Sequence, residues 1–443
     1  MAHSGQLLKI LGLAFGLAAV VGNMVGQGIL RSPGVVAIGI SEPAFILLAW
    51  LAGGVIAATA GLVYVELGTS IPRAGGQYDF VARAFGQTAG TVAGWVLVVD
   101  TCLSLALLAT VVGEFVSRLL PDLFASPVPP SVAALAGLWL LAWTGTELSS
   151  KAQIAFSAAK GIFLIGLVLV LFLIVTPATA SRTAAPMGNA PVGLLAVVMA
   201  MRAVFTTYNG WQHLTYYSEE MTDPGRNLPR AMFSGVAAVT IVYVLFNAAI
   251  LNVLTPAEIA SSKLPAGDAA GRVLGPQADL ILTVFSILSV SAILGIRMMS
   301  ASRLGFSLAR GGGLPIYFAQ VSESGTPRQA LTAMVLLSTA LVASGSYEPL
   351  LASVAATSSA MVTACVAAAI QLRIREPELA RPYRMPLYPL PAILALVFYG
   401  GLFAVFVYDD PMNSLRGLGL VALIAVLALI TWVVRGRRAA TER

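Results

Sequence analysis

Charged residues are scarce in this sequence of 443 residues. Asp, Glu, Lys and Arg together make up 10% of it, whereas a soluble domain carries about a quarter. Hydrophobic residues make up 58%, and the mean hydropathy is +0.87. The composition therefore excludes a soluble globular protein. It predicts an all-α integral membrane protein, since a helix pairs its own backbone groups within lipid.

Cysteine and histidine are nearly absent, with two residues of each. Cys102 and Cys365 lie in apolar segments far apart in the sequence, so neither a disulfide framework nor a metal cluster is expected. No region gathers paired acids, a nucleophile with its base, or metal ligands. We therefore predict that the protein is not an enzyme and holds no cofactor or metal. The net charge of +6 does not indicate nucleic-acid binding, because the basic residues fall between apolar runs.

Apolar segments that could cross a bilayer recur about twelve times, since a span needs about 20 residues. They are 8–40, 44–70, 88–119, 131–149, 153–176, 192–217, 229–254, 279–308, 328–346, 349–374, 387–408 and 413–435. Most of the 26 Lys and Arg residues fall on the inner side when the N-terminus is placed in the cytoplasm. The positive-inside rule then predicts cytoplasmic termini and a multi-pass protein of the cell (inner or plasma) membrane.

Two segments carry interruptions that a continuous spanning helix would avoid. One is the glycine-rich run 22–28 in the first segment, and the other is the run 206–210 in the sixth. Paired breaks in corresponding positions of two halves indicate a transporter's substrate site near the membrane midplane. Close packing of small residues is the alternative. A broken helix offers N–H groups to a carboxylate and C=O groups to an ammonium, so the pattern suits a zwitterion.

Several motifs occur in an order that is typical of one transporter family. They are VGNMVGQGILRSPG from Val21, YVELG from Tyr64, IPRAGGQY from Ile71, YNGWQHLTYYSEEMTDPGRNLPRA from Tyr208, SRLGFSLARGGGLP from Ser302 and LRIREPELARPYRMPLYPLPAI from Leu372. Together they resemble the amino acid-polyamine-organocation (APC) superfamily, especially bacterial relatives of the L-type amino acid transporters.

The resemblance implies a LeuT-type fold with two inverted repeats of five helices and two accessory C-terminal helices. The first repeat would span 1–185 and the second 186–380, and 381–443 would hold helices 11–12 and a cytoplasmic tail. The implied function is a sodium-independent secondary transporter of L-amino acids that works by alternating access, with proton symport or exchange left open. A transporter of cationic amino acids or polyamines is the alternative, and a non-transporting nutrient sensor is a further one.

The expected partners are a small amino acid or amine substrate, the lipid bilayer and, for symport, protons. No disulfide-linked partner subunit is expected, because the outer loop 119–127 lacks the cysteine that animal L-type relatives use for it.

Candidate substrate-binding residues follow from the two breaks. Gly26, Gln27 and Gly28 are expected to donate backbone N–H groups to a substrate carboxylate, and Asn23, Met24 and Val25 to lie near the carbonyls that receive its ammonium. The residues expected to flank the same pocket from the sixth segment are Phe205, Thr206, Thr207, Tyr208 and Asn209. By the resemblance, Thr206 stands where an aromatic gate is usual, Phe205 is its possible substitute, and Asn209 replaces a glycine.

Two charged residues within apolar segments complete the set of candidates. Lys160 matches the fifth-helix lysine of sodium-independent members, whose ammonium replaces a sodium ion and bridges the first and eighth helices; a side chain reaching the cytoplasmic interface is the alternative. Asp100 is a candidate partner for a substrate amine, or else pairs with Lys160, Arg202 or Arg297.

Overall fold

The computed structural model describes residues 6–26, 28–173, 193–344 and 347–409, together with 411–412, 419, 422–423 and 426. Over these residues the secondary structure is helical, apart from one isolated bridge between Leu11 and Met221. The α-helices are α1 (Leu13–Met24), α2 (Gly28–Gly39), α3 (Pro43–Ser70), α4 (Gln77–Phe85), α5 (Gln87–Leu119), α6 (Val128–Thr144), α7 (Thr146–Leu173), α9 (Leu194–Tyr208), α10 (Pro224–Val253), α11 (Pro256–Ser261), α12 (Pro265–Leu274), α13 (Ala278–Arg310), α14 (Arg328–Ala343), α15 (Tyr347–Arg375) and α16 (Leu390–Asp409). Short 3-10 helices are η1 (Trp211–Tyr217), η2 (Gly275–Gln277) and η3 (Ile316–Ala319).

Seven helical segments of the described chain are long and apolar enough to cross a membrane. They are Pro43–Ser70, Gln87–Leu119, Thr146–Leu173, Pro224–Val253, Pro265–Arg310, Thr357–Arg375 and Leu390–Tyr408. The pair α1 and α2 counts as an eighth span that bends by 47°, and α6 and α14 are shorter apolar helices. The predicted segment 413–435 falls almost wholly outside the described residues, so the count of twelve stays a prediction.

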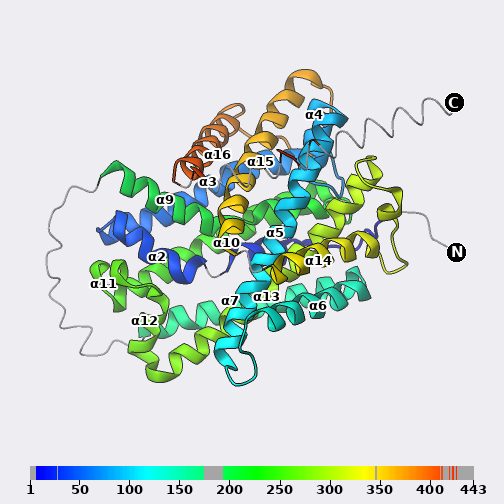
Figure 1. The fold of residues 1–443 in the computed structure, drawn as a ribbon. Coiled ribbons are helices and arrows are strands. Elements are labelled where there is room, and N and C mark those ends of the chain that lie inside the picture. The colour runs from blue at the N-terminus through cyan, green and yellow to red at the C-terminus, as the bar shows by residue number, and fades with distance from the viewer. Residues whose placement is uncertain are drawn as a thin grey trace, which may run out of the picture.

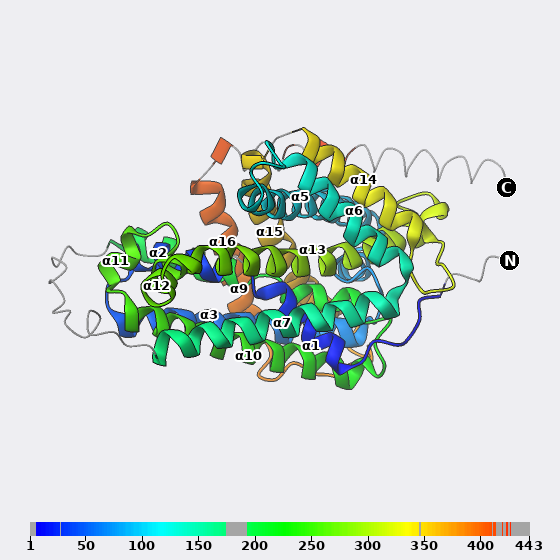
Figure 2. The same cartoon turned by 90° about the horizontal axis from the view of Figure 1, so that it is seen from below.

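Helices distant in sequence pack side by side in the bundle. Among helices that are not neighbours in sequence, the largest contacts join α5 to α13, α3 to α10, α2 to α9 and α1 to α10. In Figure 1 the helices α11 and α12 lie at one end of the bundle, and α4 lies at the other. Figure 2 shows α7, α10 and α13 running along the length of the same bundle. The break between α1 and α2 therefore falls within the bundle and not at its surface.

Glycines in α3 let two neighbouring helices approach closely. A Cβ atom on Gly54 would lie 2.1 Å from Thr240 Oγ1 of α10, and one on Gly53 would lie 2.5 Å from Val204 Cγ1 of α9. Both distances are shorter than real Cβ atoms tolerate. Small residues at such crossings bring membrane helices into van der Waals contact. The α3 glycines thereby fix the distance between α3 and the helix α9 that carries the second break.

We expect Gly54→Val to destabilise the protein, because the new side chain overlaps Thr240 and forces α3 away from α10. The matched control is Gly166→Val in α7, where an added Cβ meets nothing within 4 Å. The melting temperatures of the two purified variants in detergent are compared, with size-exclusion chromatography as the readout of the folded fraction. Equal melting temperatures for the two variants would contradict this account of the packing.

Candidate functional site

The first membrane segment is broken where the sequence predicts it. Helix α1 ends at Met24, and Val25 has an extended backbone with ψ 102°. Helix α2 starts again at Gly28, while Gln27 lies outside the described residues. Asn23, Met24 and Val25 are buried. The break thus places the end of one helix and the start of another inside the protein.

The second break lies against the first. Helix α9 ends at Tyr208, Asn209 is extended, and Gly210 has a φ of +126°, which favours glycine. A Cβ on Gly210 would lie 2.8 Å from the Asn23 carbonyl oxygen, and one on Gly28 would lie 3.0 Å from Thr207 Oγ1. Only glycine permits these approaches. The structure therefore brings the two sequence-predicted breaks together in one place.

Side chains from three other helices hold the broken backbone of α1. The Tyr243 hydroxyl of α10 donates to Met24 O at 2.7 Å and lies 3.3 Å from Thr207 O, so it connects both breaks. Ser289 Oγ of α13 donates to Val25 O at 3.2 Å. These donors pair carbonyls that the helix leaves without a partner. Sequence reasoning missed Tyr243, whose only signal was a hydroxyl in an apolar helix.

Lys160 provides the third of these contacts. Its side chain is fully buried in α7, and Nζ donates to Gly22 O at 2.7 Å and to Ser289 O at 3.2 Å. It therefore joins α1 to α13 directly. Ser157, one turn earlier, donates to Ala18 O at 2.9 Å and fixes α7 against the same helix. The side chain of Lys160 lies in the bundle interior rather than at the interface.

The five candidates on α9 do not all face the same way. Thr207 is buried, and its hydroxyl lies 2.7 Å from the Ser32 hydroxyl of α2. Thr206 is exposed and donates to Arg202 O of its own helix at 2.8 Å. The structure thus brings Thr207 to the first break and points Thr206 elsewhere.

The other three α9 candidates contact neighbouring helices. Phe205 packs edge-on against Phe398 of α16, with ring centroids 4.0 Å apart. The Tyr208 hydroxyl donates to Trp50 O at 2.8 Å, and Asn209 Nδ2 donates to Ser358 Oγ at 3.2 Å. Asn209 therefore makes a polar contact with α15. The L-type family pattern has a glycine at this position.

Asp100 is buried in α5 and already has a hydrogen-bond donor. Thr357 of α15 donates to its Oδ1 at 2.5 Å, and the charge of Arg297 on α13 acts on it. Arg297 Nε in turn donates to Asn23 Oδ1 at 3.2 Å. Of the three basic partners considered for Asp100, the structure places Arg297 near it. The hydrogen bonds of Lys160 go to Gly22 and Ser289 instead.

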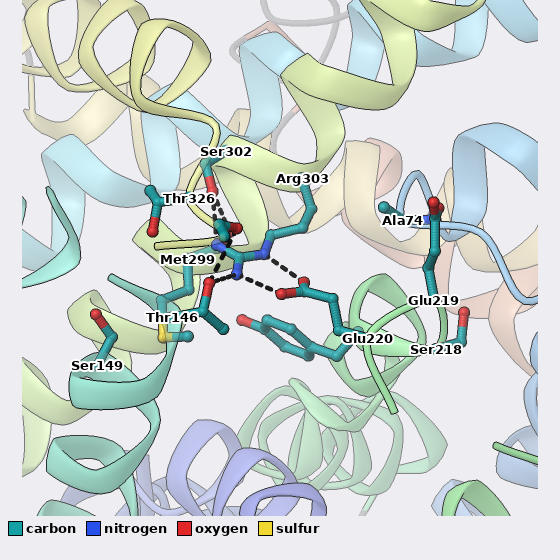
Figure 3. Close-up of polar contacts among 12 residues, drawn as sticks. Ala74, Thr146, Ser149, Ser218, Glu219, Glu220, Met299, Ser302, Arg303 and Thr326 are labelled. Carbon is teal, nitrogen blue, oxygen red and sulfur yellow. Dashed lines mark hydrogen bonds and ion pairs between the residues drawn. The ribbon is translucent and has the colours of Figure 1, made fainter. Parts of the chain in front are cut away.

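A buried ion pair joins α13 to the segment that follows η1. Arg303 of α13 donates through Nε and Nη2 to both carboxylate oxygens of Glu220, at 2.7 and 2.8 Å, and the two side chains are 2% and 0% exposed. Arg303 Nη2 also donates to Thr146 Oγ1 at 2.9 Å (Figure 3). The Leu11 N–H, just before α1, donates to Glu220 O, and the Thr222 N–H donates to Leu11 O. These contacts join α1, α7 and α13 below the breaks.

Glu219 makes a second connection in the same segment. It accepts one hydrogen bond from the Ala74 N–H at 2.8 Å, and these two residues lie side by side in Figure 3. It also accepts two hydrogen bonds from Arg310, and so ties the loop before α4 to α13. Burial raises the pKa of Glu219, but the hydrogen bonds from Arg310 and the Ala74 N–H and the charges of Arg310 and Arg73 together hold that pKa below its usual range. Glu219 therefore stays ionised and paired at neutral pH.

We expect Arg303→Met to destabilise the protein by about 3–5 kcal/mol, because it leaves the buried Glu220 carboxylate without its countercharge. The double variant Arg303→Met/Glu220→Leu removes both charges and is expected to recover much of this loss. Thermal unfolding in detergent compares the two. A double variant no more stable than the single one would show that the ion pair does not govern this region.

Comparison with known proteins agrees with this architecture. Residues 7–434 match the family described as amino acid permease. "Large neutral amino acids transporter small subunit 2" of Mus musculus is 30% identical over 435 residues, covering 94% of this chain and 80% of that protein. "Asc-type amino acid transporter 1" of Mus musculus is 28% identical, covering 94% and 80%. "b(0,+)-type amino acid transporter 1" of Mus musculus is 26% identical, covering 88% and 81%.

These matches confirm the resemblance to L-type transporters within the APC superfamily. The family and these relatives are membrane transporters of amino acids and not enzymes. This confirms the predictions that the protein is an amino acid permease of a membrane and that it is not an enzyme. Matched over nearly its whole length, the chain belongs to the amino acid permease family.

Proposed function

We propose that this permease is a sodium-independent secondary transporter of L-amino acids that works by alternating access around the two helix breaks. The observation that carries the proposal is the meeting of the breaks, with Gly210 against Asn23 and Gly28 against Thr207. Two opposed helix ends at one point offer partial charges of both signs to a zwitterion.

The substrate carboxylate would bind at the start of α2. The first N–H groups of a helix have no partner within it, and Gly28, Ile29 and Leu30 begin α2. Gly26 and Gly28 permit close approach, since added Cβ atoms would meet Ile293 and Thr207 within 3.0 Å. Gln27 stays a candidate donor outside the described residues.

The substrate ammonium would bind at the end of α1. The carbonyls of Gly22, Met24 and Val25 each accept one hydrogen bond from a neighbouring helix. A carbonyl oxygen has two lone pairs, so each retains acceptor capacity for an ammonium. Held in this way, the carbonyls are oriented before the substrate arrives.

Lys160 supports the absence of a sodium requirement. Its ammonium bridges Gly22 O of α1 and Ser289 O of α13, as a bound cation would between two helices. A fixed positive charge at this point repels a sodium ion. We further propose that the lysine either carries the coupled proton or acts as a permanent strut in an exchanger.

The arrangement of the whole chain is part of the proposal. It comprises inverted repeats at 1–185 and 186–380, accessory helices in 381–443, cytoplasmic termini, and residence in the cell membrane without a disulfide-linked partner. The basic residues Arg303 and Arg310 lie at the end where α1 is tied down, which fits a cytoplasmic inner face.

The contacts of Asp100 favour neutral substrates over cationic amino acids or polyamines. Its carboxylate holds a hydrogen bond from Thr357 and faces the charge of Arg297, which would repel a second amine. The curated relatives are named as transporters, which favours flux over a sensor function.

Uptake into proteoliposomes tests the proposal directly. We expect labelled neutral L-amino acids to accumulate without sodium. Dependence on an inward proton gradient would assign symport, and dependence on internal amino acid would assign exchange. Accumulation only in the presence of a sodium gradient, or binding of amino acids without flux, would refute the proposed function.

We expect Lys160→Ala to lower neutral amino acid uptake by about tenfold or more, because α1 loses its connection to α13 at the break. The matched control is Lys151→Ala on the same helix, whose exposed side chain pairs only with the exposed Glu147 within the described chain. Equal uptake by the two variants would remove Lys160 from the mechanism.

A further inference from the structure

A second group of polar side chains, Asp100, Arg297 and Asn23, lies beside the helix breaks. The function proposed above gives no role to the side chains of Arg297 and Asn23. Asp100 of α5 and Arg297 of α13 sit on antiparallel neighbours that pack closely along their length. Each lies about 20 Å from the cytoplasmic end of its helix, given a rise of about 1.5 Å per residue. The two charges therefore lie at the same depth, and each acts on the other.

The pair is close but not in contact. Within the described chain, no nitrogen of the Arg297 side chain lies within 4.0 Å of an Asp100 carboxylate oxygen, and Asp100 bonds to Thr357 instead. Within that part of the chain, Arg297 makes one side-chain hydrogen bond, from Nε to Asn23 Oδ1. A guanidinium has five N–H donors, so its two terminal amino groups are left available. Arg297 is also half-buried rather than fully buried, so its guanidinium is not wholly enclosed by protein atoms.

Asn23 provides an independent sign of a missing ligand. It is 3% exposed and lies on the broken end of α1, yet its Nδ2 has no hydrogen-bond partner in the described chain. The amide orientation is fixed, because Oδ1 must face the donor Nε of Arg297. Ser104, one turn beyond Asp100 on the same face of α5, likewise has a buried hydroxyl without a partner. Unpaired buried polar atoms in a native fold require an explanation such as a bound ligand.

We propose that Arg297, Asp100 and Asn23 form the subsite for the substrate's side chain and select a polar, uncharged group such as a hydroxyl or carboxamide. This inference rests on the proposed function, because it extends the site at the helix breaks. Arg297 and Asn23 donate to the side-chain oxygen, and Asp100 accepts from its O–H or N–H group. The charges of Arg297 and Asp100 are opposite and cancel. A charged substrate side chain would be attracted by one of these residues and repelled by the other, so it gains no net electrostatic binding energy.

The balance predicts that single neutralising variants change selectivity in opposite directions. Arg297→Met leaves Asp100 without its countercharge, and we expect it to admit lysine about tenfold better than the wild type. Asp100→Asn leaves Arg297 in excess, and we expect it to admit glutamate about tenfold better. The double variant restores neutrality, but it removes the guanidinium donors and replaces the carboxylate by a weaker, uncharged amide acceptor. We therefore expect it to weaken the preference for glutamine over methionine, a side chain of similar length.

The experiment measures competition by glutamine, methionine, glutamate and lysine against labelled substrate in proteoliposomes, for the wild type and the three variants. Arg118→Met and Asp279→Asn are the controls, because this exposed pair joins the same two helices at their other end. Ligand-induced thermal shifts with the same amino acids report selectivity without requiring flux. Size-exclusion chromatography establishes that each variant is folded.

Opposite shifts of charge selectivity in the two single variants, absent from the controls, would support the subsite. The proposal is overturned if folded single variants keep the wild-type order of the four amino acids, or if the wild type prefers methionine to glutamine. A wild type that shows thermal shifts in the expected order but no flux would refute transport while supporting the subsite. The failures of the two proposals are thus distinguishable.

Discussion

A polypeptide backbone cannot leave its N–H and C=O groups unpaired in hydrocarbon, and this constraint determines how the centre of the protein is built. Both helix breaks create such groups, so both must lie inside the bundle and find donors and acceptors there. The carbonyls at the end of α1 receive hydrogen bonds from Lys160, Tyr243 and Ser289, which come from three different helices. The broken backbone is therefore held in place by neighbouring helices, and each of these carbonyl oxygens keeps a lone pair for a further hydrogen bond.

The same constraint applies to charges. The interior places Arg303 directly on Glu220 in a two-point contact, which suits a connection that holds two distant parts of the chain together. Arg297 and Asp100 instead form no direct ion pair within the described chain, and each bonds to another polar group. The Arg303–Glu220 pair holds two parts of the chain together directly, whereas Arg297 and Asp100 do not. Alternating access would require the first pair to separate while the second remains near the substrate.

Much of this arrangement could be predicted from the sequence, because its signals are local. Hydropathy located the helices, and the glycines around Asn23 and Asn209 located both breaks. The family pattern predicts Lys160 as a bridge between the first and eighth helices, and in the structure its side chain bonds to Gly22 of α1 and Ser289 of α13. The partners of Asp100 and Glu220 could not be predicted in this way, since each pairing joins residues far apart in sequence. Thr206 illustrates the same difficulty, because the exact end of a broken helix decides which side chains face the site.

The central claim is that two opposed helix ends bind the two charges of one zwitterion. Binding of L-glutamine, its methyl ester and its N-acetyl derivative to the purified protein, followed by thermal shift in sodium-free buffer, tests it most directly. The ester lacks the carboxylate that α2 would bind, and the N-acetyl derivative lacks the ammonium that the carbonyls of α1 would bind. We expect stabilisation by glutamine alone. Equal stabilisation by either derivative would contradict the account, because it would show that one of the two helix ends does not take part in binding.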